Sequence, residues 1–383
     1  MQASITIAFN ASFLQPKGGG ISEYIYNIIT HLRQQDTQNR YIVYVLQDME
    51  DYAREKLPKD TRIKVIPYAS NYLGVIRRSL FSQRFWYEEE RKEGFDIFHS
   101  PFFHAPKFKH ARVILTVHDL RLYRFPSTYA LPRLIYLYFV VRRSIRRADK
   151  IISISQFTKD EIISTCGVQA DKITVIHEAI NRDDFSEKRI LPEDIAPSVT
   201  TLADIPFILS VGHLEPRKNY ERLIEAFLQL KQRAGTERIR LVIVGKKAHH
   251  YKTVIKMIEE NEDVVYLDFV SRSTLLWLYS HASLFAFPSF YEGFGFPPLE
   301  AACFDTISAV SNQSCIPEIC GEAALYYNPF DTCQMAEQMY EGLFNEDVIA
   351  QQHKSLSVNL DRFSWEKNAK QTIETYQQLL YNA

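Results

Sequence analysis

The sequence lacks any long hydrophobic run. A helix that spans a bilayer needs about 18 consecutive apolar residues, and the longest candidate run, 134–141, is much shorter. The first residues also lack the basic start of a secretory signal, and they predict a buried strand at 5–9 instead. We therefore expect a protein that does not cross a membrane and that works in the cytoplasm. A location at the inner face of the membrane stays open.

Neither sign of charge is in excess. The chain has 45 Lys and Arg against 46 Asp and Glu, which gives a formal net charge of -1 and excludes bulk attraction to nucleic acid. The basic residues are nevertheless uneven along the chain, because several crowd one segment of the first half. They are Arg133, Arg142, Arg143, Arg146, Arg147 and Lys150.

Cysteine is scarce as well. Five cysteines are an odd number spread through predicted core and loops, which favours reduced thiols in a cytosol. Cys315 and Cys320 could begin a metal site, but no second pair and no nearby histidine completes four ligands. We therefore expect no metal there.

The sequence does contain a regular alternation of strand-like apolar runs and helical stretches, which is typical of parallel sheets with crossover helices. With 383 residues the chain is long for a single core. We predict an α/β protein with two doubly wound parallel-sheet domains. The first series of strands is expected at 5–9, 41–46, 62–66, 97–99, 113–117, 150–154 and 173–176, and the second at 207–211, 240–244, 264–267, 284–287, 307–309 and 324–326.

The domain boundaries follow from the stretch between the two series, which has three prolines and no sustained periodicity. We predict a first domain at 1–182, an interdomain linker at 183–206 and a second domain at 207–362. The tail, 363–383, has apolar residues at helical spacing and Ser364 as a cap, so it predicts a final helix.

The most informative stretch is 283–303, in which a buried strand runs through a glycine-bearing loop into a helix. Pro297 and Pro298 suit the start of that helix. Gly293 and Gly295 let backbone N–H groups approach a ligand closely, next to a helix N-terminus. This arrangement indicates a site for a nucleotide sugar.

Two carboxylates, Glu292 and Glu300, flank this loop eight residues apart. Here the sequence resembles the retaining glycosyltransferases of family 4, which carry a Glu-x7-Glu motif in such a setting and have the two-domain GT-B fold. The resemblance covers nearly the whole chain and implies two Rossmann-like domains that face a central cleft. It implies that Glu292 contacts the donor sugar, that Gly293, Phe294 and Gly295 line the donor with backbone N–H groups, and that Glu300 binds the ribose.

The resemblance also implies that the last helix crosses back to the first domain. An ordinary terminal helix packed on the second domain is the alternative.

A second constellation, 210–219, follows the first strand of the second domain. Arg217 and Lys218 lie at a loop-to-helix junction, where they could neutralise a leaving nucleoside diphosphate. The resemblance assigns phosphate binding to Lys218. The chain departs from the family pattern after Gly212, because His213 stands where an arginine is usual. Arg217 could supply that charge, or it could be a solvated charge at the start of the helix.

The first domain offers a glycine loop and two strand ends. Gly19 and Gly20 follow the opening strand, and the resemblance places such a loop over the donor diphosphate; a flexible turn is the alternative. His118 and Asp119 end an apolar strand at the edge where α/β ligand crevices open. The resemblance places His118 near the donor sugar. Asp119 and His99 are candidates for the acceptor side, although packing would explain His99 equally well.

These patterns and the resemblance imply a retaining hexosyltransferase that acts in polysaccharide or lipopolysaccharide biosynthesis. The chain has no Asp-x-Asp triplet for a metal-bound diphosphate, so we expect a reaction without metal or cofactor. Similarity to bacterial mannosyltransferases favours GDP-mannose as donor and a saccharide or lipid-linked saccharide as acceptor. The alternatives are a sugar-nucleotide epimerase of the same fold, a pyridoxal-phosphate phosphorylase and a non-catalytic sugar-nucleotide-binding subunit.

The basic segment lies on a predicted helix within 129–150, where arginines alternate with aromatic and aliphatic residues. Such a helix could lie on an anionic membrane and collect a lipid-linked acceptor. A helix with Leu134, Tyr138 and Val141 in the core and its arginines in solvent would have the same pattern.

Overall fold

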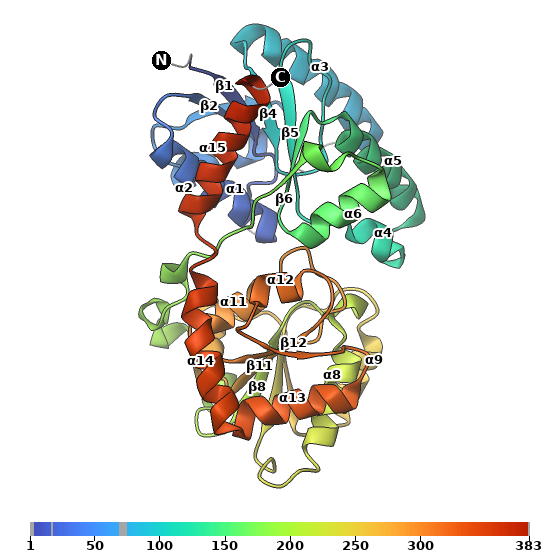
Figure 1. The fold of residues 1–383 in the computed structure, drawn as a ribbon, viewed down its shortest axis with the longest axis vertical. Helices are drawn as coiled ribbons and strands as arrows, with labels where there is room; N and C mark the ends of the chain where they lie inside the picture. Colours follow the sequence, from blue (N-terminus) through green and yellow to red (C-terminus); the bar gives the residue numbers. More distant parts are fainter. Residues whose placement is uncertain (1–3, 17, 69–74, 382–383) are drawn as a thin grey trace. The chain divides into compact units, whose positions relative to one another are not determined.

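The computed structural model describes residues 4–16, 18–68 and 75–381. The chain forms two compact units (Figure 1), and the first contains both ends of the sequence. The units are Met1–Ala179 with Ser364–Ala383, and Ile180–Phe363. Each unit has one parallel sheet with helices on both faces, so the predicted fold class is confirmed.

The first unit is built on a seven-stranded sheet in the order β3-β2-β1-β4-β5-β6-β7. Its strands are β1 (Thr6–Asn10), β2 (Arg40–Leu46), β3 (Arg62–Ile66), β4 (Ile97–Ser100), β5 (Arg112–Val117), β6 (Lys150–Ser153) and β7 (Ile173–Val175). All seven predicted strands are confirmed within one residue at each end. The prediction succeeds because strands covered on both faces are almost continuously apolar.

Helices cover both faces of this sheet. They are α1 (Gly19–Gln35), α2 (Glu50–Lys56), α3 (Val75–Glu93), α4 (Arg121–Arg124), α5 (Leu131–Arg147), α6 (Gln156–Cys166) and α15 (Trp365–Tyr381). Side chains of α1, α2 and α15 form the core on one face, and side chains of α3, α5 and α6 form the core on the other.

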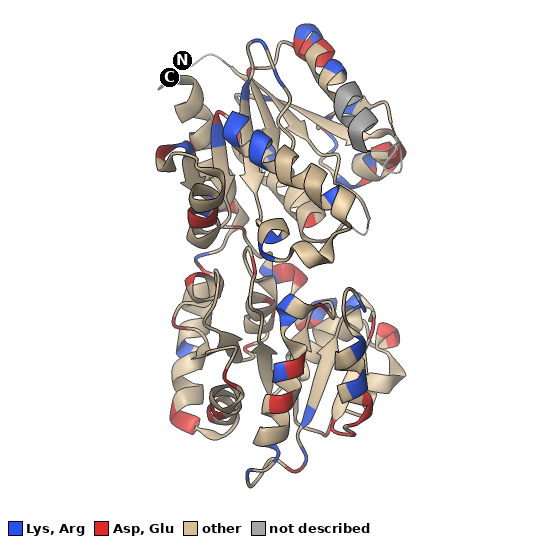
Figure 2. Cartoon of the chain, turned by 90° about the vertical axis from the view of Figure 1, so that its right-hand side faces the viewer, with Lys and Arg blue, Asp and Glu red and all other residues tan. Residues whose placement is uncertain are grey.

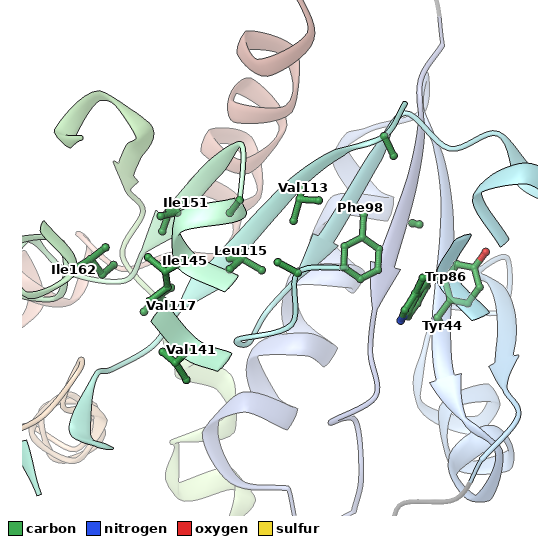
Figure 3. Close-up of a cluster of buried hydrophobic side chains, with 14 of the residues drawn as sticks. Tyr44, Trp86, Phe98, Val113, Leu115, Val117, Val141, Ile145, Ile151 and Ile162 are labelled. Carbon is green, nitrogen blue, oxygen red and sulfur yellow. The ribbon is translucent and has the colours of Figure 1, made fainter. Parts of the chain in front are cut away.

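Figure 3 shows the second of these cores, where Trp86, Ile145 and Ile162 come from three helices and Phe98 and Leu115 come from the sheet. Each of these side chains is at most 1% exposed. Burying a large apolar side chain contributes about 1.5–3 kcal/mol. These contacts hold α5 and α6 against the strands whose ends carry polar residues.

The last helix, α15, packs within the first unit. Trp365 and Tyr376 are buried, and the ring of Trp365 lies 5.9 Å from that of Tyr24 on α1. The side chain of Ser364 accepts a hydrogen bond from the backbone N–H of Lys367 at 3.2 Å, so the predicted cap is confirmed. This unit is therefore assembled from two separate segments of the chain.

The second unit has a six-stranded sheet in the order β10-β9-β8-β11-β12-β13. Its strands are β8 (Phe207–Val211), β9 (Arg240–Val244), β10 (Val264–Leu267), β11 (Leu284–Phe287), β12 (Ser308–Ser311) and β13 (Leu325–Tyr327). Its helices are α7 (Pro197–Thr200), α8 (Tyr220–Leu230), α9 (Lys252–Glu259), α10 (Arg272–His281), α11 (Phe296–Ala302), α12 (Ile316–Cys320), α13 (Thr332–Phe344) and α14 (Glu346–Leu360). All six strands lie within two residues of their predicted bounds.

The stretch expected as a linker, 183–206, is packed on the second unit instead of running free. The backbone N–H of Leu191 donates to Ser273 Oγ at 3.2 Å, and Val199 and Leu202 are buried. Its prolines start short helical turns that bring these sparse apolar residues against the sheet domain. Low periodicity therefore marked irregular structure that belongs to the second unit.

Among the described residues, no helix has the length and apolar character that crossing a bilayer requires.

Candidate functional site

Four charged side chains meet at the carboxyl edge of the second sheet, because Glu215 Oε1 also lies 2.6 Å from Arg217 Nε. Arg217 and Lys218 lie in a short 3-10 turn after β8, and Glu292 follows β11. Lys218 Nζ lies 2.6 Å from Glu292 Oε1, and Arg217 Nη1 lies 2.7 Å from Glu292 Oε2. One carboxylate thus bridges two cations that the sequence placed in a separate motif 74 residues away.

The surroundings of this cluster shift its titration. Burial alone would raise the pKa of the Glu292 carboxyl, but Lys218 and Arg217 outweigh burial and lower it to about 2. Burial lowers the pKa of the Lys218 ammonium, and Glu292 opposes that shift. The ring of Phe287 lies 4.9 Å from Lys218 Nζ and adds a cation–π contact. The cluster is therefore an ionised, desolvated group of charges.

Arg217 is not a solvated charge at the start of α8. Only 15% of its side chain is exposed, and Nη1 also donates to the backbone carbonyl of Tyr291 at 3.0 Å. His213, in contrast, is exposed. Between the two, it is Arg217 that the structure brings to Glu292.

The backbone around Lys218 is fixed by two special positions. Asn219 has a left-handed φ of 56°, which asparagine tolerates better than most residues, and its side-chain amide donates to the carbonyls of Pro288 and Pro329 at 3.2 and 2.8 Å. At Gly212 a Cβ would lie 3.0 Å from Lys218 Cε, so glycine gives the lysine side chain its path. The sequence had named Gly212 but not Asn219.

The loop after Glu292 is supported by residues that follow the next strand, β12. Ser314 Oγ accepts from the Glu292 backbone N–H at 3.1 Å, and Cys315 Sγ donates to the carbonyls of Glu292 and Phe294 at 3.1 and 3.2 Å. The side chain of Phe294 is buried, and Gly295 takes a φ of +92° just before α11. The sequence did not predict these contacts of Ser314 and Cys315, because the only notable feature near Cys315 is a second cysteine.

Glu300 lies on α11 and accepts a hydrogen bond from the Tyr279 hydroxyl of α10 at 2.7 Å. Burial raises the pKa of the Glu300 carboxyl, and Tyr279 opposes that shift. The environment of Glu300 therefore shifts its pKa in the opposite direction to that of Glu292. The Glu300 carboxylate can accept further hydrogen bonds from hydroxyl groups.

In the first unit, His118 forms a buried ion pair with Glu178, a residue to which the sequence analysis assigned no role. His118 Nδ1 lies 2.7 Å from Glu178 Oε1, and Nε2 lies 3.0 Å from the carbonyl oxygen of Pro101. Both partners are acceptors, so both ring nitrogens carry protons. Burial alone would lower the pKa of His118, but Glu178 outweighs it and raises the pKa.

His99 does not line a ligand site, which corrects one acceptor-side candidate. It is 0% exposed, its Nδ1 lies 2.6 Å from the Tyr376 hydroxyl, and its Nε2 lies 2.8 Å from Thr116 Oγ1. Burial, with a contribution from the charge of His118, lowers the pKa of His99 to about 3. It is a neutral core histidine that ties β4 and β5 to α15.

The first unit contains a cavity of about 400 Å³ beside the carboxyl ends of its strands. His118 and Asp119 line it, as the sequence predicted for a crevice at this edge. Asp119 Oδ1 also accepts from the backbone N–H of Arg121 at 3.0 Å. Much of the remaining lining is aromatic or basic, and of these residues only Arg133 was named from the sequence, as part of the basic segment. The lining includes Phe13, Phe102, Arg121, Tyr129, Arg133 and Tyr136.

The glycine loop of the first unit leads directly into α1. Gly19 has a φ of +64°, and a Cβ at Gly19 or Gly20 would meet nothing within 4 Å. At Gly18 a Cβ would lie 2.4 Å from that of Ser22, so here glycine is needed for close packing. Gly19 and Gly20 thus face open space, as a ligand-facing loop would.

Comparison with known proteins decides the family. The model described as "Glycosyltransferase Family 4" matches residues 18–184, and the model described as "Glycosyl transferases group 1" matches residues 194–347. The chain belongs to glycosyltransferase family 4. Together the two matches cover most of both units, and they include the Arg217–Lys218–Glu292 cluster.

Two curated members are similar to this glycosyltransferase in sequence. The O-antigen chain mannosyltransferase B of Escherichia coli is 29% identical over 288 residues, which is 74% of each chain. The O-antigen chain mannosyltransferase RfbU of Salmonella typhimurium is 30% identical over 220 residues, which is 57% of each chain. The fold is shared with Anabaena Alr3699/HepE, solved in complex with UDP-glucose, at a TM-score of 0.72 and 17% identity over 98% of this chain and 100% of that one.

Proposed function

We propose that this glycosyltransferase moves mannose from GDP-mannose to a saccharide or lipid-linked saccharide in the assembly of a surface polysaccharide. The observation that carries the proposal is the bridging of Glu292 by Lys218 and Arg217. Two curated relatives named as O-antigen mannosyltransferases support mannose, and their names favour neither an epimerase nor a non-catalytic subunit.

A nucleoside diphosphate is the ligand that suits two adjacent buried cations. Its phosphate oxygens would compete with Glu292 for Lys218 and Arg217, because phosphate accepts charge-assisted hydrogen bonds from both side chains. Released from the cations, Glu292 could accept hydrogen bonds from hydroxyl groups of the donor sugar. Before the donor binds, Glu292 therefore pairs with Lys218 and Arg217. The diphosphate of the donor would then replace Glu292 as the partner of these two cations.

The chemistry follows from the charge that develops. The bond from the anomeric carbon to the diphosphate oxygen breaks, which leaves an oxocarbenium-like sugar and an anionic leaving group. Lys218 and Arg217 would stabilise that leaving group. The acceptor hydroxyl oxygen then attacks the same face of the sugar, and its proton passes to the departing phosphate, so the configuration is retained. No metal ion is needed for this charge balance, since two protein cations serve the phosphates.

In the first unit, the cavity beside His118 would receive the acceptor. Its aromatic residues suit the faces of sugar rings, and Asp119 and Arg133 offer an acceptor and a donor of hydrogen bonds. His118 is already bonded through both ring nitrogens, so it would act on the sugar through its positive charge unless Pro101 releases Nε2.

A transfer assay with GDP-mannose, UDP-glucose and UDP-galactose, with and without EDTA, tests this proposal. We expect transfer from GDP-mannose, insensitive to EDTA, with an α-linked product by NMR. Transfer only from a uridine donor would overturn the choice of donor, and an inverted product would overturn the mechanism. Release of mannose without any acceptor-dependent product would favour a different reaction class.

A further inference from the structure

The helix α5 presents large apolar side chains outward. Its inner face is buried in the core through Val141 and Ile145. Another side of the helix, which we call the outer face, begins with four side chains at positions i, i+4, i+7 and i+8. They are Leu131, Ile135, Tyr138 and Phe139, with exposed fractions of 67%, 51%, 44% and 70%.

The C-terminal end of α5, next to the outer face, is basic. Four arginines follow Phe139 over the last two turns, and Figure 2 shows basic residues gathered at this end of α5. Within the described part of the chain, none of them is ion-paired with a carboxylate, although Arg146 Nε and Arg147 Nη1 donate to the backbone carbonyls of Cys166 and Ala105. Burial, with the like charge of Arg143, lowers the pKa of Arg147. The four are Arg142, Arg143, Arg146 and Arg147.

A surface with exposed apolar side chains beside arginines that have no carboxylate partner suits one kind of binding partner. We propose that the outer face of α5 docks this enzyme on an anionic lipid bilayer. The apolar residues would enter the boundary between head groups and acyl chains, and the arginines would meet lipid phosphates. A nucleic acid would leave the apolar half in water, and a second copy of α5 would bring like charges together.

The helix α5 also borders the cavity, so docking would place the cavity near an acceptor held in the bilayer. Arg133, Tyr136, Leu137 and Val140 line the cavity from α5, on the side between its core and outer faces. An acceptor whose lipid stays in the bilayer would therefore present its saccharide next to the cavity. This second step rests on the proposed function, whereas the docking itself does not.

Sedimentation with vesicles tests the docking on the full chain without any donor. One set of vesicles contains phosphatidylcholine alone, and the other contains equal parts of phosphatidylcholine and phosphatidylglycerol. We expect binding to the anionic vesicles only. Arg143→Gln should weaken it roughly fivefold at low salt and lose its effect at high salt. Phe139→Ser should weaken it roughly tenfold at either salt concentration.

The matched controls are Arg91→Gln on α3 and Val358→Ser on α14, which are exposed and outside α5, and we expect neither to change binding. A wild-type chain that ignores anionic vesicles, binds neutral ones equally, or binds a short oligonucleotide as tightly would overturn the docking. So would equal losses in the controls.

A second readout separates docking from activity. Transfer to a soluble saccharide should stay unchanged in Phe139→Ser and Arg143→Gln, because neither residue lines the cavity. Transfer to a lipid-linked saccharide held in anionic vesicles should fall with their binding. Equal rates on the vesicle-held acceptor would overturn the link to the acceptor, even where docking is observed. A chain that binds vesicles but transfers no sugar at all would count against the proposed function alone.

Discussion

At the scale of single residues, the cluster around Glu292 is poorly suited to stabilising the fold and well suited to exchanging partners. Taking charges out of water costs several kcal/mol per ion, and mutual attraction often only offsets that cost. A ligand that brings its own negative charge can therefore replace Glu292 without a large net penalty. The buried lysine and arginine are held ready by Phe287, Tyr291 and the rigid turn at Asn219.

Substituting the two ends of this bridge should separate binding from transfer. Glu292→Gln should keep or raise the affinity for GDP, because it frees Lys218 and one side of Arg217, whose Nε stays paired with Glu215, while kcat falls about 100-fold or more. Lys218→Ala should weaken GDP binding about 10- to 100-fold, because a charged hydrogen bond contributes about 1.5–3 kcal/mol. Calorimetric titration of GDP and steady-state kinetics measure the two effects.

The exposed Lys256→Ala on α9 is the control for charge removal and should change neither quantity. If Glu292→Gln lost GDP affinity as strongly as Lys218→Ala, the competition between carboxylate and phosphate would be wrong.

The His118–Glu178 pair makes stability depend on pH. Because the folded state raises the pKa of His118 above its ordinary value of 6.5, the stabilisation is complete below that pH and is lost as pH rises above it. Glu178→Gln should remove this loss, so the difference in Tm between wild type and variant should shrink from pH 6.5 upwards. A difference in Tm that stays constant over this range would contradict the pairing. The lowered pKa of His99 affects stability only below pH 6.5, and it affects the wild type and the Glu178→Gln variant alike.

At the scale of elements, the strands could be predicted because each is an apolar run that the sheet buries on both faces. That same burial is why the role of His99 stayed open: on a strand covered on both faces, the sequence does not say whether a polar side chain meets a ligand or a neighbour. The meeting of Lys218 with Glu292 could be expected from the family motif, but not its form as an ion-paired bridge. Ser314 and Cys315 carry no local pattern that would reveal their support of the loop.

The helix α15 is tied to the first sheet by a buried hydrogen bond as well as by packing. Tyr376→Phe should keep the packing but leave His99 Nδ1 without its hydrogen-bond partner, at a cost of about 1–3 kcal/mol in the free energy of unfolding. Denaturant unfolding measures the change. Tyr340→Phe, on α13, should stay within about 0.5 kcal/mol. Equal effects would mean that the hydroxyl of Tyr376 contributes little.

At the scale of the whole molecule, the second unit is one continuous segment and the first is not. The first unit needs Ser364–Ala383 to cover one face of its sheet, whereas Ile180–Phe363 contains its own two cores. The two units can therefore unfold separately, and the chain need not unfold in a single transition.

A chain that ends at Phe363 should lose cooperative unfolding of the first unit, because residues such as Trp365 and Tyr376 no longer fill its core. Its second unit should still be stabilised by GDP, since a ligand of the native state raises apparent stability by mass action. Thermal unfolding with and without GDP, monitored by circular dichroism, distinguishes the two units. An unchanged first transition would show that α15 is dispensable.

The discontinuous first unit also sets an order of events during synthesis. Domains usually fold as they leave the ribosome, with the N-terminal one first. Here the segment that begins the chain has to wait, with one face of its sheet uncovered, until the final helix has been made. The unit that carries Arg217, Lys218 and Glu292 can be complete before the unit that is translated first, so, if these residues bind the donor as proposed, a nascent chain would gain the capacity to hold a nucleotide before the rest of the enzyme exists.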